Sequence, residues 1–293
     1  MISINPKEIK QSQLHAYLLS AVAPRPICLA STIDAEGNAN LSPFSFFNIF
    51  SSNPPIAIFS PARRGRDNTT KHTLQNVHEI KECVINVVNY NIVQQMSLSS
   101  CEYPKGVSEF TKSGLTPIES TIVKPFRVKE SPVQLECIVK EVVALGTEGG
   151  AGNLVICEIV AMHIQENILN EQGNIDQQKI DLVGRLGADW YVRASGDALF
   201  EVPKPNVKLG IGYDQLPISI KQSTILSAND LGMLANIEAL PTPEEIKNFN
   251  ETNVFIEHKV QHATLEQLHT IAKVLLTRNM LKEAWLVLLQ GVD

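Results

Sequence analysis

Four cations lie close together in a chain that is acidic overall. Residues 60–73 read SPARRGRDNTTKHT and hold four cations against one acid, a local charge of +3, whereas the formal net charge of the chain is −6. The cations are Arg63, Arg64, Arg66 and Lys71. This balance does not favour a broad positive surface for nucleic acid or an anionic membrane. The segment predicts a local phosphate site, although an exposed basic loop would explain the same residues.

A helix is expected to begin directly after these cations. In TTKHTLQNVHEI the apolar residues recur at helical spacing, and Thr69 or Thr70 can cap the helix. The first amide groups of a helix have no partner inside it and lie at the positive end of its dipole. Lys71, with the hydroxyls of Thr70 and Thr73, would complete a pocket for a phosphate group.

A second polar segment combines hydroxyls and amides with two adjacent aromatic residues. Residues 25–48, RPICLASTIDAEGNANLSPFSFFN, predict a β-hairpin that turns at Asp34–Gly37 and closes on Phe46-Phe47-Asn48. A hairpin with its polar residues in water is one explanation of this composition. The other is a ligand that needs hydroxyl and N–H partners beside apolar cover.

Short runs rich in β-branched residues dominate the middle of the chain. The expected strands are PICLASTI, PPIAIFS, CVINVV, VQLECIVKEVVAL and NLVICEIVAMHI, and the last two form a hairpin through GTEGGAG. This glycine-rich turn lacks the Lys-Ser/Thr ending and the following helix of a phosphate-binding loop, so a plain turn is favoured. The pattern predicts a mainly β fold, an antiparallel β-barrel with inserted helices, and not a doubly wound sheet.

The start of the chain predicts a helix. Asn5 is its expected N-cap, Pro6 its first helical residue, and Pro24 ends it. The segment lacks the basic and then apolar layout of a signal peptide, and no apolar run approaches the ~18 residues of a membrane span. We therefore expect a cytoplasmic protein.

The composition changes again in the last third of the chain. Residues 202–217 form a Pro- and Gly-rich connection, and capping boxes follow at Thr242–Glu245 and Thr264–Gln267. We therefore divide the chain into a domain of residues 1–203 and a helical C-terminal extension of residues 204–293. An apolar stripe on the helices is expected to pack on the barrel or on another subunit. It includes Leu268, Ala272, Leu275 and Trp285.

Cysteine and histidine residues give little sign of a metal or redox site. Four cysteines lie in apolar runs and are expected to be buried free thiols. They are Cys28, Cys83, Cys137 and Cys157. Cys101 has polar neighbours that could expose it, and we interpret it as a bystander. His258 and His262 have metal-ligand spacing without a third ligand, so a solvated surface pair is favoured and no metal is expected.

Six segments of the chain, in this order, resemble the flavin reductase-like family of FMN-binding split barrels, which includes flavoredoxin. They are RPICLASTIDAEGNANLSPFSFFN, SSNPPIAIFSP, TKHTLQN, GVSEFTKSGLTP, ESPVQLEC and DLVGRLGADWY, and they fall within residues 20–193. The resemblance implies an FMN-binding split barrel, a homodimer, and noncovalently bound FMN. The helical C-terminal extension goes beyond the minimal family domain, and the resemblance does not address its role. The family commonly has Lys-Asp-Thr where this chain has Lys71-His72-Thr73, which retains the cation and the hydroxyl.

The resemblance also implies which residues contact the cofactor. The hydroxyls of Ser31 and Thr32 would approach the ribityl phosphate arm, Lys71 would bind the phosphate, and residues 45–48 would line the isoalloxazine. Arg185 and Tyr191 match late family positions that complete the pocket, and a structural ion pair is the alternative for Arg185. The candidate contacts are Ser31, Thr32, Ser45, Phe46, Phe47, Asn48, Ser60, Arg64, Lys71, Thr73 and Arg185.

Two classes of function are compatible with this resemblance. As an enzyme, the protein would pass electrons from NADH or NADPH to FMN and on to free flavin, a metal chelate or a partner oxygenase. As an electron carrier, it would serve a protein partner without a productive nicotinamide site. Oxidation of the pyridoxamine-phosphate type on a similar barrel fits the motifs less well. No side chain is assigned as acid or base, because hydride transfer to a flavin depends on alignment and access.

Overall fold

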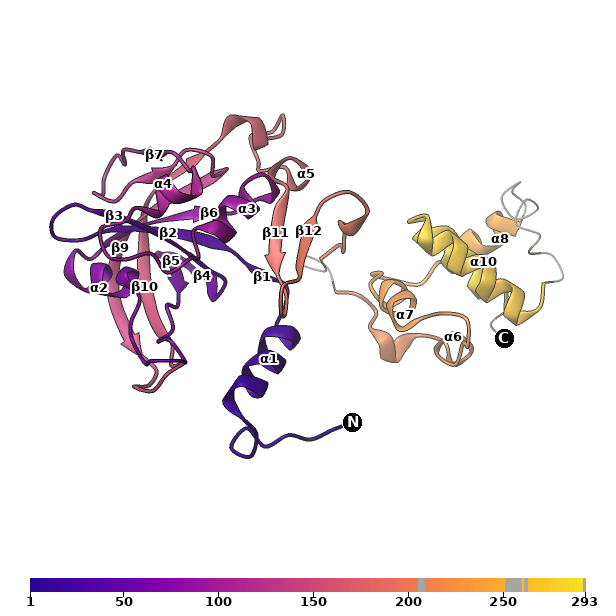
Figure 1. Ribbon diagram of the computed structural model, residues 1–293. Coiled ribbons are helices and arrows are strands. Elements are labelled where there is room, and N and C mark those ends of the chain that lie inside the picture. The colour runs from indigo at the N-terminus through magenta and orange to yellow at the C-terminus, as the bar shows by residue number, and fades with distance from the viewer. Residues whose placement is uncertain (205–208, 251–259, 261–262, 292–293) are drawn as a thin grey trace. The chain divides into compact units, whose positions relative to one another are not determined.

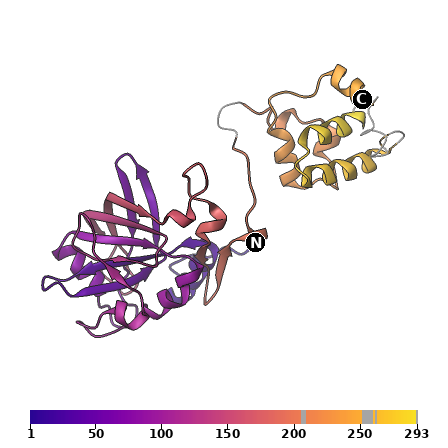
Figure 2. The same cartoon turned by 90° about the horizontal axis from the view of Figure 1, so that it is seen from above.

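The computed structural model describes residues 1–204, 209–250, 260 and 263–291. The chain forms two compact units, Met1–Phe200 and Glu201–Asp293. Figures 1 and 2 show a β-rich N-terminal unit and a helical C-terminal unit. The roles assigned from the sequence, a cofactor-binding domain and an extension, stay predictions. His258 and His262 lie outside the described residues.

A seven-stranded sheet forms the frame of the N-terminal unit, and its neighbouring strands are all antiparallel. Its strand order is β3-β2-β6-β9-β10-β5-β4. The strands are β2 (Cys28–Ile33), β3 (Ala39–Phe44), β4 (Phe47–Ser52), β5 (Pro55–Phe59), β6 (Glu82–Val87), β9 (Val133–Ala144) and β10 (Asn153–Ile164). The five strand segments expected from the sequence lie in this sheet. The glycine-rich segment joins β9 to β10, as predicted.

Smaller elements surround this sheet. A three-stranded sheet has the order β1-β11-β12, and β7 pairs with β8. These strands are β1 (Arg25–Pro26), β7 (Pro117–Ile118), β8 (Arg127–Val128), β11 (Leu182–Arg185) and β12 (Tyr191–Ala194). The helices of the unit are α1 (Gln11–Ala21), α2 (His72–Glu79), α3 (Val93–Leu98), α4 (Glu109–Ser113) and α5 (Gln177–Ile180).

The core of the N-terminal unit contains the cysteines that the sequence placed in apolar runs. Cys28, Cys83, Cys137 and Cys157 are buried free thiols, and Cys101 is exposed, so both predictions are confirmed. The Sγ atoms of Cys83 and Cys157 lie 3.6 Å apart. These thiols therefore pack as small apolar groups inside the barrel.

The predicted hairpin is present, but it ends at Phe44 and does not close on Phe46-Phe47-Asn48 as expected. Phe47 and Asn48 begin the next strand, β4, which the sequence did not indicate. β2 pairs with β3 from Cys28 opposite Phe44 to Ile33 opposite Ala39. The Asp34 carboxylate holds the turn by accepting hydrogen bonds from the backbone N–H groups of Glu36 and Asn38. Gly37 adopts φ +85° there. Beyond it, β4 pairs with β5. Phe44 is thus fixed by its pairing with β2, and Phe47 by its pairing with β5.

The helix α1 begins later than the sequence predicted. Asn5 does not cap it, because the Asn5 side chain and backbone oxygens accept the N–H groups of Lys7 and Glu8 and close a separate turn. Lys10 occupies the N-cap position without a side-chain hydrogen bond. Local hydrogen bonding by Asn5 therefore competes with the first helical turn.

The helix α2 follows the basic segment as predicted, but neither threonine caps it. Lys71 holds the N-cap position, and its side chain makes no capping hydrogen bond. The Thr69 hydroxyl donates to Asp67 at 2.6 Å, and the Thr70 hydroxyl accepts from Gln75 at 3.2 Å. Both threonines lie before the cap position, so the Thr69 hydroxyl bonds within the loop and the Thr70 hydroxyl bonds to a side chain of α2.

The C-terminal unit has a hydrophobic core of its own. Its helices are α6 (Ile218–Lys221), α7 (Ala228–Ala235), α8 (Pro243–Asn250), α10 (Leu265–Thr277) and α11 (Leu281–Leu288). Both predicted capping boxes form, at Thr242–Glu245 and Thr264–Gln267. The expectation that the apolar stripe packs on the barrel or on another subunit was wrong. Its residues Leu268, Ala272, Leu275 and Trp285 are buried within this unit, where α7 helps to cover them.

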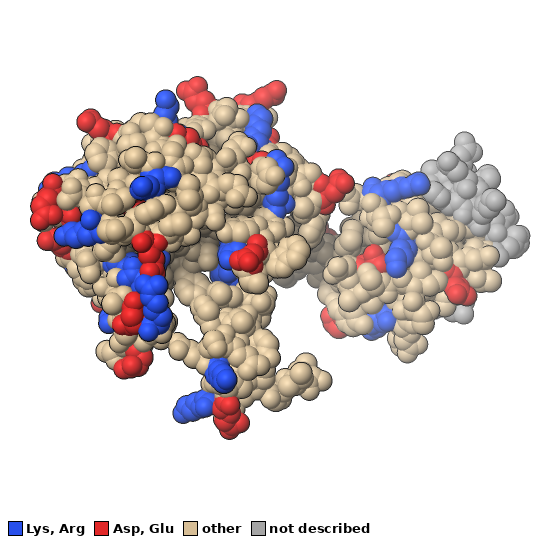
Figure 3. All heavy atoms as spheres, viewed as in Figure 1, with Lys and Arg blue, Asp and Glu red and all other residues tan. Residues whose placement is uncertain are grey.

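The described surface has no single sign of charge on the visible face of the N-terminal unit (Figure 3). Figure 3 shows acidic and basic side chains interspersed over the visible face of the N-terminal unit. In the described part of the chain, no helix combines the length and the apolar character needed to cross a membrane.

We expect residues 1–203 to fold without the C-terminal unit, because each unit encloses separate hydrophobic clusters. The fragment should show a cooperative thermal transition and the near-ultraviolet circular dichroism of a packed core. A fragment that lacks both signals while remaining in solution would contradict this expectation.

Candidate functional site

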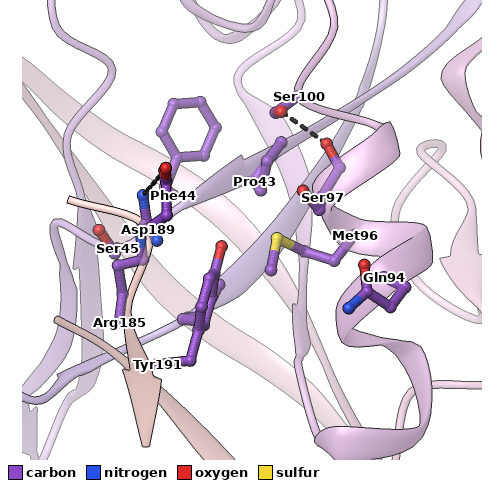
Figure 4. Close-up of a pocket in the computed structure, with 11 residues that line it drawn as sticks. Pro43, Phe44, Ser45, Gln94, Met96, Ser97, Ser100, Arg185, Asp189 and Tyr191 are labelled. Carbon is purple, nitrogen blue, oxygen red and sulfur yellow. Dashed lines mark hydrogen bonds and ion pairs between the residues drawn. The ribbon is translucent and has the colours of Figure 1, made fainter. Parts of the chain in front are cut away.

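A cavity of about 550 Å³ lies at the end of β3. Figure 4 shows that Gln94, Met96 and Ser97 enter it from α3, whereas Arg185 and Tyr191 enter it from the β11–β12 hairpin. We call it the central cavity. Its lining residues are Ile27, Pro43, Phe44, Ser45, Gln94, Met96, Ser97, Ser100, Arg185, Asp189 and Tyr191.

The side chain of Arg185 is held against Tyr191 in the wall of the central cavity. Its guanidinium carbon lies 4.5 Å from the centroid of the Tyr191 ring, a cation–π distance. A nitrogen of Arg185 also lies 3.9 Å from a carboxylate oxygen of Asp189, which is fully exposed. Such an exposed pair stabilises little. Arg185 therefore lines the cavity and also makes a weak ion pair, as the two sequence interpretations had proposed separately.

Arg25 is a buried cation directly behind this wall. It is the cross-strand partner of Arg185 between β1 and β11. Its side chain donates to the backbone oxygens of Leu19, Val22 and Leu186 and, at 3.3 Å, to the Ser45 hydroxyl. Burial, followed by the charge of Arg185, lowers the pKa of Arg25. Arg25 thus fixes Ser45 and the β11–β12 turn in place.

A second cavity, of about 340 Å³, also has Ser45 in its wall. We call it the aromatic cavity. It brings together five predicted site residues, namely Ser45, Phe46, Phe47, Asn48 and Ser60. Phe46 is 43% exposed, and its ring meets His15 of α1 edge to face at 6.5 Å. An aromatic surface of this kind can cover one face of a planar ligand.

A third, smaller cavity of about 20 Å³ carries the cations predicted to bind phosphate, and we call it the basic pocket. It shares Ser100 with the central cavity. Burial, followed by the charge of Arg64, lowers the pKa of Lys71, whose Nζ lies 5.4 Å from the centroid of the Phe44 ring. The lining residues are Asn40, Ser42, Arg64, Lys71, His72, Ser100, Cys101, Glu102, Tyr103 and Glu109.

The loop before α2 turns Arg64 into the basic pocket. The guanidinium of Arg64 donates to the Thr69 hydroxyl at 2.9 Å, to the Thr70 backbone oxygen at 2.8 Å and to the Glu102 carboxylate at 2.9 Å. Arg63 instead donates to the Asn68 side chain at 2.6 Å. Of the four clustered cations, Arg64 and Lys71 therefore line the pocket.

Comparison with known proteins identifies the family of this arrangement. Residues 20–179 match the flavin reductase like domain. The chain belongs to the flavin reductase-like family. It is 37% identical over 196 residues to an uncharacterized protein of Aquifex aeolicus, a match that covers 67% of this chain and 97% of that one. The C-terminal unit lies outside the family match.

Solved structures show the same family and its fold. Nitrilotriacetate monooxygenase component B from Bacillus cereus is 29% identical, with a TM-score of 0.64, and the match covers 69% of this chain and 98% of that one. A protein described as a flavin reductase with a split barrel domain, from Shewanella frigidimarina, is 31% identical, with a TM-score of 0.58 and coverage of 68% and 95%. The predicted split barrel with C-terminal helices is confirmed.

Three predicted hydroxyls of this flavin reductase-like chain lie inside the barrel. Ser31, Thr32 and Thr73 have no exposed surface. The Asn40 side chain donates to Thr32 at 3.1 Å and to Thr73 at 3.0 Å. Ser31 Oγ has no hydrogen-bond partner among the described residues. The hydroxyls of Thr32 and Thr73 therefore hold Asn40 in the wall of the basic pocket, and contact of all three hydroxyls with a ligand stays a prediction.

The glycine-rich turn between β9 and β10 braces the basic loop of this flavin reductase-like domain. Two backbone hydrogen bonds join Arg63 of the basic loop to the turn. The Arg63 N–H donates to the Ala151 oxygen at 2.8 Å, and the Gly150 N–H donates to the Arg63 oxygen at 3.0 Å. A Cβ atom on Gly152 would lie 2.8 Å from the Ser60 hydroxyl. The plain turn expected from the sequence is present, and its glycines allow a close approach to the loop that carries Arg64.

The sequence did not identify several residues that line the cavities. Segment 97–106, SLSSCEYPKG, was considered only for Cys101, yet it places Ser100, Glu102 and Tyr103 beside the cations. The available signal for a binding residue in this segment was the pair Glu102 and Tyr103 beside the Pro-Lys-Gly turn. Arg25 had a weaker signal, a charged residue at the start of an otherwise apolar strand.

Proposed function

We propose that this protein binds FMN and acts as an NAD(P)H-dependent flavin reductase that passes electrons to an acceptor. The observation that carries the proposal is the basic pocket beside the central cavity, with Ser100 in the wall of both. A charged pocket next to a larger one with aromatic walls suits a ligand with a phosphate at one end and a planar ring at the other.

The donors present fit an FMN phosphate and a flavin ring. In this proposal Lys71 and Arg64 bind the phosphate, with Ser60 and Thr73 supporting their loop and helix. Ser45, which lines both larger cavities, contacts the ring, and Arg185 closes the central cavity. Phe46, Phe47 and Asn48 cover the ring from the side of the aromatic cavity. Ser31 and Thr32 remain candidates for the ribityl phosphate arm. These are the remaining contacts that the family resemblance implies.

FMN would supply a ring that accepts hydride from a nicotinamide and gives electrons to an acceptor. The protein's own part is to bind the flavin, orient it and cover its ring. Arg25 holds Ser45 by a hydrogen bond, while Tyr191 holds the Arg185 guanidinium at a cation–π distance in the cavity wall. We propose free flavin, a metal chelate or a partner oxygenase as the acceptor. The similarity to nitrilotriacetate monooxygenase component B supports the oxygenase.

Anaerobic mixing tests the proposed activity. FMN-loaded protein is combined with NADH or NADPH, and flavin absorbance is followed in time. We expect rapid bleaching with at least one nucleotide. If dithionite bleaches the flavin and neither nucleotide does, the reductase proposal fails and an electron carrier is favoured. A purified protein that gains no flavin absorbance with excess FMN would end both.

We also propose a homodimer. The helix α1 buries none of its residues, and apolar side chains of β4 and β10 are exposed, including Phe50 at 65% and Met162 at 52%. Apolar surface of this kind commonly marks an interface between subunits. Light scattering of the FMN-loaded protein should give twice the chain mass of 32.3 kDa. A mass of one chain would refute the dimer.

Replacing Gly152 with alanine is expected to weaken FMN binding a few fold. The new Cβ atom would press on Ser60 Oγ and displace the loop that carries Arg64. Fluorescence quenching of FMN measures the effect. Gly232→Ala is the matched control, because no described heavy atom outside its own helix lies within 4 Å of its Cβ position. Equal FMN affinities for the two variants and the natural protein would show that the turn does not position the loop.

A further inference from the structure

The basic pocket already contains a carboxylate from the chain itself. Glu102 accepts a hydrogen bond from Arg64 Nε at 2.9 Å with one oxygen, and its other oxygen accepts from Arg66 Nη2. The remaining cavity of about 20 Å³ is roughly the space of one water molecule. A phosphate group cannot occupy this pocket while Glu102 keeps its place.

Glu102 can leave the pocket without disrupting a helix or strand. Residues 99–108 lie between α3 and α4 and belong to neither. The side chain of Glu102 is 46% exposed, so its carboxylate has access to water. Its hydrogen bonds to Arg64 and Arg66 lower its pKa, which keeps it ionised at neutral pH. An exposed ion pair of this type is weak enough to exchange for another anion.

Carboxylate and phosphate are alternative partners for the same guanidinium group. Both present oxygen acceptors that match the donors of arginine. Arg64 also donates to Thr69 and Thr70, so its position does not depend on Glu102 alone. An ionised Glu102 that remained nearby would also repel a phosphate dianion.

We propose that Glu102 sets how strongly the site discriminates a phosphorylated flavin from riboflavin, by competing with the phosphate for Arg64. This inference rests on the proposed function. Removing the charge of Glu102 should therefore tighten FMN binding, whereas a carboxylate that only supports Arg64 would, once removed, weaken it. The two roles predict opposite changes in affinity.

The test compares FMN and riboflavin affinities in the natural protein and in Glu102→Gln. We expect the variant to lower the Kd for FMN about fivefold, the worth of one exposed ion pair, and to leave the Kd for riboflavin unchanged. FMN should also associate faster with the variant. Glu36→Gln is the matched control. Glu36 is exposed and pairs with Lys105, which lies in the same segment 99–108 as Glu102, and it does not contact Arg64.

An unchanged or weaker FMN affinity in Glu102→Gln would overturn the inference and leave the proposed function standing. A natural protein that binds neither flavin would overturn both. Equal tightening of FMN and riboflavin would also overturn it, because competition for a phosphate site cannot act on a ligand without phosphate. Equal melting temperatures of the variant and the natural protein verify that the fold is intact.

Discussion

Lys71→Ala is expected to weaken FMN binding by about 10- to 100-fold and to leave riboflavin binding nearly unchanged. A hydrogen bond to a charged group contributes about 1.5–3 kcal/mol, and each 1.4 kcal/mol is tenfold in affinity. Lys71 is half-buried beside Phe44, so its ammonium group has little competing water. The difference between the two flavins isolates the contribution of the phosphate. Fluorescence titration with each flavin measures it.

Two further variants sharpen this prediction. Lys71→Met keeps the length of the side chain without its charge and should resemble Lys71→Ala. Lys140→Ala removes an exposed cation that pairs with Glu158 on the sheet, and it should bind both flavins normally. If Lys71→Ala bound FMN and riboflavin as the natural protein does, the phosphate assignment would fail even though the flavin proposal survived.

The affinity for FMN should also fall at high pH. Burial, and then the charge of Arg64, lowers the pKa of Lys71 below its usual value of 10.5. The ammonium form binds phosphate, so the affinity is retained below this lowered pKa and is lost as the pH rises through it. Riboflavin affinity should not show this loss. A parallel loss for both flavins would point to unfolding.

Replacing Glu136 with glutamine is expected to destabilise the N-terminal unit by about 3 kcal/mol. Glu136 of β9 has no exposed surface. Its carboxylate accepts the backbone N–H groups of Thr121, Ile122 and Val123 and lies 2.7 Å from the Nε2 atom of His163. An amide nitrogen cannot accept these donors, and buried groups left without partners carry a penalty of this size.

Urea unfolding of the two proteins measures this difference. The matched control is Glu158→Gln, which changes a partly exposed carboxylate on the neighbouring strand β10 and should alter the free energy of unfolding by less than about 0.5 kcal/mol. Equal stabilities of Glu136→Gln and the natural protein would mean that Glu136 does not anchor residues 121–123.

The same carboxylate should make stability depend on acid pH. Burial alone would raise the pKa of Glu136, but hydrogen bonds from Thr121, Ile122 and His163 outweigh it and lower the pKa from 4.5 to about 2. Its contribution is therefore complete above about pH 4.5 and is lost as the pH falls toward 2. The stability difference between the natural protein and Glu136→Gln should shrink over that range. A difference that stays constant from pH 5 to 3 would contradict this assignment.

Local sequence patterns predicted many of the strands, helix starts and buried residues of this protein. Runs of β-branched residues predicted the strands of the large sheet, because strand formation depends on extended backbone and on side chains that pack on a pleated surface. Capping boxes at Thr264 and Thr242 predicted helix starts, since the bonds involved span only three residues. The apolar neighbours of four cysteines predicted their burial.

Local patterns failed where a neighbouring residue or another part of the chain decided the outcome. Asn5 has the residue type of an N-cap, yet its oxygens close an earlier turn. The stripe around Trp285 had to be buried, but only the packed helices showed that it is buried within its own unit. Burial can be predicted from composition, whereas the partner that provides it depends on the tertiary fold.

The candidate site shows the same division. The sequence alone determined that cations and hydroxyls cluster before α2 and that aromatic residues follow the β2–β3 hairpin, but it did not show that Phe47 and Asn48 belong to the next strand, β4. Only the tertiary structure placed Arg25 opposite Arg185, set Glu102 against Arg64, and folded the β9–β10 turn onto the basic loop. These contacts join residues that are distant along the chain, and strand register and loop packing determine them. Residue type and local spacing carry no information about that register.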